Sequence, residues 1–307
     1  MKRRLLTLAA VVPVAAAPLL MTAAENETND LAQPIRVAAR AEVITPATQM
    51  PADPSDLDIP SFVETDKQTS DATEPAGHAA IRSQVALLEA SMAKLDAIPA
   101  YTATLVKQER VDGELRDAER TIIKVRHEAF SVYMKWETGS AGQEVLYVDG
   151  KYDNQMLVHP GGWKGRFLPT LSVEPGGSLA MSQSRHPVTE AGLKILLQKH
   201  IDHRAEDLKT DYCVATTTAV SHEGRPATSL ECIYKSQAAS PDYSRTVLII
   251  DDATGMPVLS RNFGWTSLDL DGEDATLIEH YEYRDIDLDA GLTKADFKRT
   301  NKKYNFK

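Results

Sequence analysis

The chain has 307 residues, a formal net charge of −10 and two cysteines. This acidity argues against nucleic-acid backbones and anionic membrane surfaces as main partners, because both carry the same sign of charge. Beyond the N-terminus no apolar run approaches the length that crosses a bilayer, so we do not expect an integral membrane protein.

The N-terminus has the layout of a secretory signal peptide. Basic residues at positions 2–4 precede an apolar stretch from Leu5 to Leu20, and small residues lead to Ala24. We predict cleavage after Ala24, which removes residues 1–24 and leaves a mature chain with a net charge of −13. Arg3-Arg4 lacks the rest of a twin-arginine motif, so the general export route is favoured. No cysteine lies near the cleavage site to carry a lipid anchor, and we expect a protein of the periplasm or another exported compartment.

Residues 25–76 differ in composition from the rest of the chain. They are rich in Asp, Glu, Thr, Pro and Ala, and their scattered apolar residues follow neither helical nor strand periodicity. Such a segment cannot bury enough apolar surface to offset its chain entropy, so we predict a disordered acidic tether. The alternative is a short partner-binding peptide around residues 59–63.

We assign residues 77–307 to one mostly β (α+β) domain. An apolar residue recurs every three or four positions from Ile81 to Leu95, which predicts an amphipathic helix that ends before Pro99. Short alternating runs separated by turn residues then predict strands. The first group of strands comprises Tyr101–Arg110, Thr121–Arg126, Phe130–Trp136, Glu144–Val148 and Tyr152–His159.

An irregular stretch from Pro160 to Pro187 interrupts the strands, and loops of this length are often functional. A second helix is predicted for Val188–Ile201, with Leu193, Leu196, Leu197 and Ile201 as its buried stripe. The second group of strands comprises Tyr212–Val220, Ala227–Lys235, Arg245–Asp251, Pro257–Trp265 and Thr276–Ile286. Consecutive hairpins predict an antiparallel sheet, and two helices of this size can cover one of its faces.

The two cysteines lie on one predicted hairpin. In an oxidising compartment we expect Cys213 and Cys232 to form a structural disulfide. A turn at His222-Glu223 sets the cysteines directly opposite each other, within disulfide range. A turn at Glu223-Gly224 suits glycine better, but it shifts the cysteines two positions out of line, which we expect to be too far for a bond without a bulge. We favour the first register, because the expected bond selects it.

Little in the sequence supports metal, cofactor or hydrolytic chemistry. His200 and His203 could share a helix face, but no H-E-x-x-H motif occurs, and histidines at a helix C-terminus also suit the helix dipole. We therefore predict no metal site and no cofactor. The chain has no G-x-S-x-G motif, and neighbours along the extended segment Ser184-Arg185-His186 point apart. A hydrolase is accordingly the least favoured function.

Two features have a structural and a functional interpretation. The string His159-Pro160-Gly161-Gly162-Trp163 is either a tight turn whose tryptophan plugs the domain edge, or a gate at a pocket mouth. Phe130, Val132, Met134 and Trp136 share one face of a strand and line either a packed core or an apolar ligand cavity. The residues alone favour the packed core.

Several strings together resemble the DUF1571 family, namely Tyr101–Arg110 with the following residues 111–115, Phe130–Trp136, His159–Trp163 and Ser184–Gly192. The match covers roughly residues 78–307. In its layout, the family is similar to the LolA/LolB-like superfamily of periplasmic lipoprotein carriers and receptors. This resemblance implies a curved antiparallel sheet that forms an unclosed half-barrel. It also implies that the N-terminal and mid-chain helices pack on the concave face, over an apolar cavity that receives acyl chains.

From this resemblance we expect a non-enzymatic cell-envelope protein that binds a lipid or a lipid-modified polypeptide. The expected cavity lining is Phe130, Val132, Met134 and Trp136, and the expected pocket gate is His159, Gly161, Gly162, Trp163, Arg185 and His186. The alternative is a periplasmic sensor or scaffold that binds an envelope protein partner through the same fold. An open cavity favours the carrier, whereas a packed interior with an exposed apolar patch favours the scaffold.

Overall fold

The computed structural model describes residues 76–265 and 275–306. The predicted signal peptide, almost all of the predicted tether and the alternative binding peptide at residues 59–63 lie outside these ranges. A helix and a run of hairpins follow one another in the expected order, so the described part of the chain has the predicted mostly β architecture.

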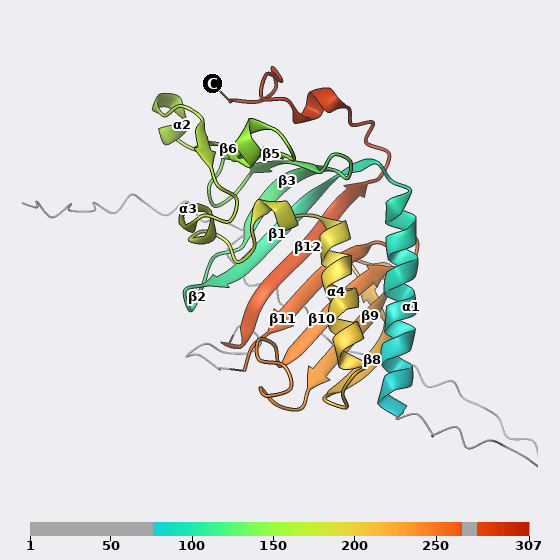
Figure 1. Ribbon diagram of the computed structural model, residues 1–307. Coiled ribbons are helices and arrows are strands. Elements are labelled where there is room, and N and C mark those ends of the chain that lie inside the picture. Colours follow the sequence, from blue (N-terminus) through green and yellow to red (C-terminus); the bar gives the residue numbers. More distant parts are fainter. Residues whose placement is uncertain (1–75, 266–274, 307) are drawn as a thin grey trace, which may run out of the picture. The chain divides into compact units, whose positions relative to one another are not determined.

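One antiparallel sheet of 12 strands organises the described residues (Figure 1). Its strand order is β7-β6-β5-β4-β3-β1-β12-β11-β10-β9-β8, with the short β2 paired to β1 alone. Since β7 and β8 are the two ends of this order, the sheet is not closed into a barrel. The strands are β1 Ala100–Val111, β2 Glu114–Leu115, β3 Glu119–Arg126, β4 Ser131–Trp136, β5 Glu144–Val148, β6 Met156–His159, β7 Leu171–Val173, β8 Cys213–His222, β9 Arg225–Tyr234, β10 Arg245–Asp251, β11 Pro257–Phe263 and β12 Leu277–Asp287.

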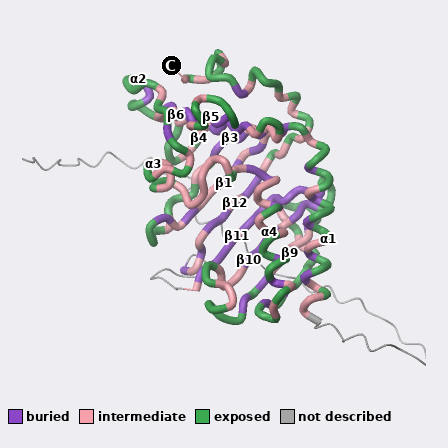
Figure 2. The backbone as a smooth tube through the Cα atoms, viewed as in Figure 1, coloured by how far each residue is buried: buried purple, intermediate pink, exposed green. Residues whose placement is uncertain are grey.

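Two helices cover one half of the concave face. α1 (Ala76–Asp96) and α4 (Leu193–Asp207) lie side by side over the strands from β12 to β8 (Figure 1). Their leucines join the main core, which continues into the sheet through Leu230 and Leu248. Figure 2 shows buried residues along the central strands and mostly exposed or half-buried residues around the short helices α2 (Lys164–Phe167) and α3 (Ser178–Met181). The other half of the concave face therefore has a thinner cover.

The mid-chain helix begins later and ends later than its pattern predicts. Val188–Glu190 forms a separate 3-10 turn, η2, and α4 starts at Leu193 because Gly192 breaks the chain direction with a φ of +105°. The helix then continues to Asp207, beyond the predicted end at Ile201. Leu193 and Leu197 are fully buried as expected, whereas Leu196 and Ile201 are half-buried and pack against the core.

The predicted strand Tyr152–His159 is also shorter in the structure. Tyr152–Asn154 is a 3-10 turn, η1, in which all three residues have positive φ, so β6 begins only at Met156 and pairs with β5 from Leu157 onward. The sequence pattern did not distinguish this turn from a strand, because Tyr152 continues the alternation.

The favoured register of the cysteine hairpin is wrong. Cys213 pairs with Tyr234, Cys232 pairs with Ala215, and the turn falls at Glu223-Gly224. Both turn residues have positive φ, which glycine adopts without strain, so the turn sets the register. The two thiols nevertheless point to the same face, and their sulfurs lie 4.0 Å apart.

The C-terminal segment covers the outer face of β4–β6. Phe297, from the 3-10 turn η4 (Lys294–Phe297), packs against Leu146 and Leu157. The ring of Tyr304 stacks on Tyr133 with centroids 3.8 Å apart. This outer cover explains why every residue of β5 is buried, since the cavity side and the outer side of that strand are both occupied.

Candidate ligand cavity and its lid

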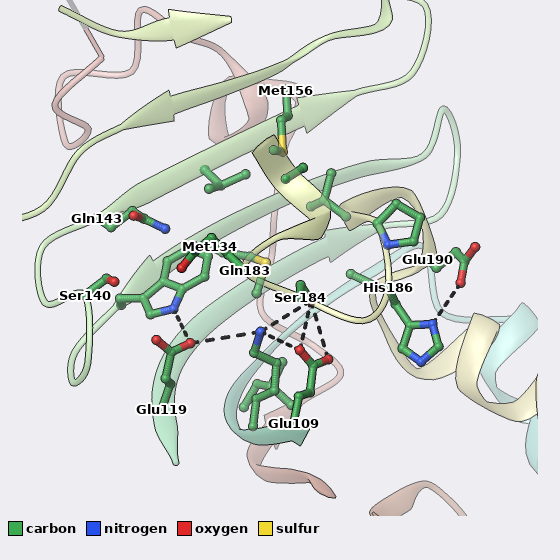
Figure 3. A pocket seen from close by; sticks show the side chains of 18 of the residues that line it. Glu109, Glu119, Met134, Ser140, Gln143, Met156, Gln183, Ser184, His186 and Glu190 are labelled. Carbon is green, nitrogen blue, oxygen red and sulfur yellow. Dashed lines mark hydrogen bonds and ion pairs between the residues drawn. The ribbon is translucent and has the colours of Figure 1, made fainter. Parts of the chain in front are cut away.

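A cavity of about 1000 Å³ lies on the concave side of the sheet. It reaches from β6 across β4 and β1 to α4, and the segment of residues 160–187 (the lid) closes it from above (Figure 3). The interior is thus open, contrary to the packed core that the residues alone favoured. The space stays open because the two helices α1 and α4 fill only the half of the concave face next to β8.

Apolar side chains from the sheet form one wall of the cavity. They alternate along the strands, so each contributing strand directs every second residue inward. This wall comprises Leu105, Met134, Trp136, Val145, Met156 and Val158. The indole N–H of Trp136 donates a 3.0 Å hydrogen bond to Glu119, so the ring lies fixed at the wall.

The structure divides the four predicted lining residues. Met134 and Trp136 line the cavity. Val132 is fully buried in the core on the same face of β4. Phe130 borders a smaller, separate cavity of about 390 Å³ beside Tyr147 and Ile195. The alternation along the strand identified the face correctly, but the position of the hollow along that strand depends on where α4 and the lid lie.

The lid begins with the Gly-Gly pair and is fixed there to the β4–β5 loop. A Cβ atom at Gly161 would lie 2.5–2.6 Å from backbone atoms of Ser140, Ala141 and Gln143, so only glycine fits. The N–H of Gly162 donates to the carbonyl of Ala141 at 3.0 Å. This close backbone approach is the structural reason for the two glycines.

Five large apolar side chains are exposed at the lid, and we call them the rim. Trp163 and Phe167 are 71% and 77% exposed, with their rings 6.5 Å apart. The rim comprises Trp163, Phe167, Leu168, Leu171 and Leu179, of which all but Phe167 also line the cavity. Trp163 is therefore not a plug of the domain edge, and its exposure is compatible with a gate. Among the other predicted gate residues, His159 is buried beneath the lid, next to Gly165.

Two buried glutamates form the polar end of the cavity. Glu109 of β1 and Glu279 of β12 are directly opposite each other in the strand pair, and both are 3% exposed. Like charges at such positions repel, so both carboxylates need hydrogen-bond donors. The hydroxyl of Tyr281 lies between the two carboxylates, where it donates to Glu109 and approaches Glu279 at 3.4 Å. Lys107 forms an ion pair with Glu109 at 3.2 Å.

The return segment of the lid is bound by these two glutamates, and Figure 3 shows the contact of Ser184 with Glu109. Ser184 Oγ and the backbone N–H of Arg185 each donate to Glu109 at 3.1 Å. The guanidinium of Arg185 and the imidazole of His186 reach Glu279 at 3.3 and 2.9 Å. The motif Ser184-Arg185-His186 is therefore a clamp that fixes the lid to the sheet. The hydroxyl of Ser184 donates to the carboxylate of Glu109 and not to His186, so Ser184 has a structural role.

The clamp has a strong effect on the ionisation of Glu279. Burial by itself would raise the pKa of this carboxyl, but the hydrogen bond and charge of His186, with help from Asn262 and Arg185, lower the pKa to about 2. Burial and the charges of both glutamates raise the pKa of Tyr281, so its hydroxyl remains a donor. The carboxylate of Glu279 is consequently ionised at neutral pH.

His200 and His203 both border the cavity. His200 is buried against Ser260, with its Nε2 3.2 Å from the hydroxyl, and because α4 continues to Asp207 it does not lie at the helix end. Burial, followed by the charge of Arg204, lowers the pKa of His200 to about 3, so this side chain is neutral. The interpretation of the pair as a decoration of the helix end was wrong for His200.

Sequence reasoning did not identify Glu109, Glu279 or Tyr281 as site residues. The signal that was available is the position of Glu109 within the string Tyr101–Arg110, on the same inward face as Leu105. The partner strand β12 joins it only through a contact between residues 170 positions apart, since Glu109 pairs with Glu279.

The fold and the site together define a class of protein: an unclosed antiparallel half-barrel with a lidded, largely apolar cavity. The chain belongs to the family described as "Protein of unknown function (DUF1571)", which matches residues 98–306. No curated protein sequence matches this chain. Of the helices within residues 76–265 and 275–306, none is both long and apolar enough to cross a membrane.

Several solved structures are similar to this chain. MucB shows 16% identity and a TM-score of 0.39 over 70% of this chain and 62% of its own. The lipoprotein LppX of Mycobacterium tuberculosis shows 13% identity and a TM-score of 0.36, over 66% and 93%. A putative outer membrane lipoprotein-sorting protein domain from Vibrio parahaemolyticus shows 11% identity and a TM-score of 0.35, over 71% and 97%. Because these TM-scores lie below 0.5, we base no functional argument on these structures.

Proposed function

We propose that this protein is a non-enzymatic cell-envelope protein that binds a lipid, or the acyl chain of a lipid-modified polypeptide, in the lidded cavity. The observation that carries the proposal is the cavity of about 1000 Å³, which has an apolar wall and opens beside the exposed rim. A volume of this size matches the sites that enclose ligands in other proteins.

Burial of methylene groups supplies the binding energy in this proposal. Transfer of a methylene from water to an apolar site contributes about 0.8 kcal/mol, so ten enclosed methylenes contribute about 8 kcal/mol before the cost of ordering the chain. Met134, Met156 and Val158 offer the inner contact surface, and the methionines adapt readily to the shape of a ligand. The rim provides the first apolar contact for a chain that enters.

The polar end of the cavity supports binding and not catalysis. Glu109 and Glu279 receive hydrogen bonds from the lid and from the sheet, and they hold the lid in place. Ser184, the residue that a hydrolase would use, is one of these donors. Export remains part of the proposal, through the predicted signal peptide at residues 1–24 and an envelope or periplasmic location.

A cavity-filling substitution tests the proposal. Val158 is half-buried on β6 and lines the cavity, so Val158→Trp places an indole in the hollow. Val214 on β8 is 52% exposed, so Val214→Trp is a matched control with the same change in side chain. Native mass spectrometry of the purified mature protein should detect bound lipid in the wild type and in Val214→Trp, and little in Val158→Trp.

Binding of a fluorescent fatty acid provides the second measurement. It should saturate at one or a few molecules per chain in the wild type and fall at least tenfold in affinity in Val158→Trp, because the occupied hollow no longer admits the chain. A wild-type protein that neither retains lipid nor binds the fatty acid would refute the proposal.

A further inference from the structure

The tip of the β8–β9 hairpin lies against β12, and together they gather five polar side chains. His222 and Glu223 come from the hairpin tip, and His280, Glu282 and Arg284 come from β12. We call these five residues the hairpin-tip cluster. Nε2 of His222 lies 3.4 Å from Oε1 of Glu282, and Nε2 of His280 lies 3.8 Å from Oε2 of the same carboxylate.

The Nε2 atoms of the two imidazoles are inaccessible to solvent and only loosely satisfied. The acceptor that both face is the carboxylate of Glu282, at 3.4 Å from His222 and 3.8 Å from His280, which is longer than a normal hydrogen bond. The His280 side chain is only 8% exposed. Buried polar atoms without a well-formed hydrogen bond cost free energy and are rare in folded proteins, so these two nitrogens require an explanation.

The spacing of the nitrogens and the carboxylate fits a metal ion. Zinc binds histidine nitrogen and carboxylate oxygen at about 2.0–2.2 Å with tetrahedral geometry, which separates neighbouring ligand atoms by about 3.3–3.6 Å. The distances of 3.4 and 3.8 Å at Glu282 are close to this separation. One ligand atom each of His222, Glu223 and Glu282 also lies within 4.8 Å of the other two.

We propose that the hairpin-tip cluster binds a divalent transition-metal ion of the zinc class. His222 through Nε2, with Glu282 and Glu223 through their carboxylates, forms the set whose ligand atoms lie within 4.8 Å of one another. His280 lies outside that set, with its Nε2 3.8 Å from Glu282, and is the fourth ligand that we propose, reaching the ion from β12. Imidazole and carboxylate donors together suit zinc better than magnesium or calcium, which prefer oxygen donors alone. Glu223 is 48% exposed, so the ion can reach the site from solvent.

Arg284 does not prevent binding by its charge. The carboxylates of Glu223 and Glu282 carry two negative charges and the guanidinium one positive charge, so the cluster is net negative when both imidazoles are neutral. Arg284 pairs with Oε2 of Glu282 at 2.9 Å and with Oε1 of Glu223 at 3.1 Å. It therefore orients both carboxylates, as the partners of metal ligands commonly do.

A second group of metal-ligand residue types lies beside α4, but its carboxylate is already engaged by other side chains. Asp207, Cys213 and Cys232 also approach one another within 4.8 Å. The carboxylate of Asp207, however, already accepts hydrogen bonds from Arg204 at 3.0 Å and from Tyr234 at 3.2 Å. Asp207 is the single carboxylate of this group, so with the buried guanidinium of Arg204 beside it the group has no net negative charge when both thiols are protonated.

The proposed ion has a structural role that is separate from the cavity. His280 and Glu282 alternate along β12 with Glu279, Tyr281 and Tyr283, which line the cavity, so they project from the opposite face of the strand. In the sheet, β11, β10 and β9 lie between β12 and β8, so the ion joins parts that are not neighbours. It stabilises the curvature of this half of the sheet.

Zinc titration of the tag-free full-length mature protein tests the site. After removal of metal with a chelator, competition against a chromophoric zinc indicator should give one tightly bound Zn²⁺ per chain, and saturating Zn²⁺ should raise the melting temperature. His222→Ala and His280→Ala should each weaken zinc binding by about 100-fold or more and abolish the thermal shift. Mg²⁺ and Ca²⁺ should not compete at equal concentration.

The control is His78→Ala, which removes a histidine that bonds to the carbonyl of Thr210 at the other end of the hairpin strands. It should bind zinc as the wild type does. If His280→Ala fails to fold, the exposed variant Glu223→Gln keeps the test decisive, with an affinity about tenfold lower and an unchanged circular dichroism spectrum. A wild-type protein without stoichiometric zinc binding, or cluster variants that bind zinc as tightly as the wild type, would overturn the proposal.

Discussion

The hydroxyl of Tyr101 accepts a hydrogen bond from the backbone N–H of Leu193 at 2.8 Å, so a strand side chain caps a helix that lies 92 residues further along the chain. The first turn of a helix leaves N–H groups without partners, and Gly192, the residue before α4, has no side chain to supply one. A Cβ atom at Gly192 would lie 2.8 Å from the same hydroxyl. Tyr101 and Gly192 thus fix the start of α4 together.

We expect Tyr101→Phe to destabilise the fold by about 1–2 kcal/mol, because it leaves the buried N–H of Leu193 without an acceptor while the ring remains in place. Chemical denaturation monitored by circular dichroism measures the change. Tyr212→Phe, at a half-exposed ring before β8, is the matched control and should be neutral. Equal stability of the two variants would contradict the capping role.

The carboxylate of Glu279 should make a large contribution to stability. Glu279→Gln keeps the shape of the side chain but leaves the charge of Arg185 in the clamp without its partner. We expect a loss of about 3 kcal/mol in the free energy of unfolding. Glu114→Gln removes an exposed pair with Arg116 and should change stability by less than about 0.5 kcal/mol. A loss of similar size in both variants would show that the clamp is unimportant.

The same carboxylate predicts a pH dependence. Its pKa is lowered to about 2 in the folded protein from an ordinary value of 4.5, so its stabilising effect is complete above pH 4.5 and is lost as the pH falls towards 2. Wild-type stability should decrease over this window, and Glu279→Gln should lack this part of the decrease. Parallel stability curves of the two proteins between pH 4.5 and 2 would contradict the assignment.

The rim predicts a separation of binding from stability. Trp163 is 71% exposed, so Trp163→Ala should change the free energy of unfolding by no more than about 0.5 kcal/mol. If Trp163 gates the cavity, the same variant should bind a fluorescent fatty acid about tenfold more weakly, because apolar contact at the mouth is lost. Tyr212→Ala removes an exposed ring outside the rim and should bind normally. Unchanged binding in Trp163→Ala would exclude the gate.

The disulfide between Cys213 and Cys232 remains a prediction. Their sulfurs lie 4.0 Å apart on neighbouring strands, close enough for a small rotation of both side chains to bring them together. We expect no free thiol in the denatured, unreduced exported protein, and a loss of about 3 kcal/mol on reduction. Titration of two free thiols would refute the bond.

The sequence pattern predicted the parts of the fold that depend on neighbouring residues. Alternation located most strands and their hairpins, and the apolar spacing from Ile81 to Leu95 located α1. The register of β8 against β9 was mispredicted because an expected disulfide outweighed the conformational preference of Gly224. In this hairpin the local backbone requirement decided the pairing.

The candidate site was less predictable because it forms from distant segments. Met134 and Trp136 could be assigned to the inward face from their spacing, whereas the empty space in front of them depends on where α4 and the lid lie. Glu109 and Glu279 face each other only because β1 pairs with β12, the last strand. No local pattern marks a glutamate on a strand as buried.

Because the two long helices cover only the half of the sheet next to β8, the two halves of the concave face differ in their packing. One half is packed as a hydrophobic core, and the other half encloses the cavity. β1 and β12 form the border, and the paired glutamates at this border anchor the lid to the packed half. If the proposed function holds, a guest in the hollow half meets a cover that is clamped to a rigid frame, so that substitutions along the wall alter which guest is accepted while the frame stays folded.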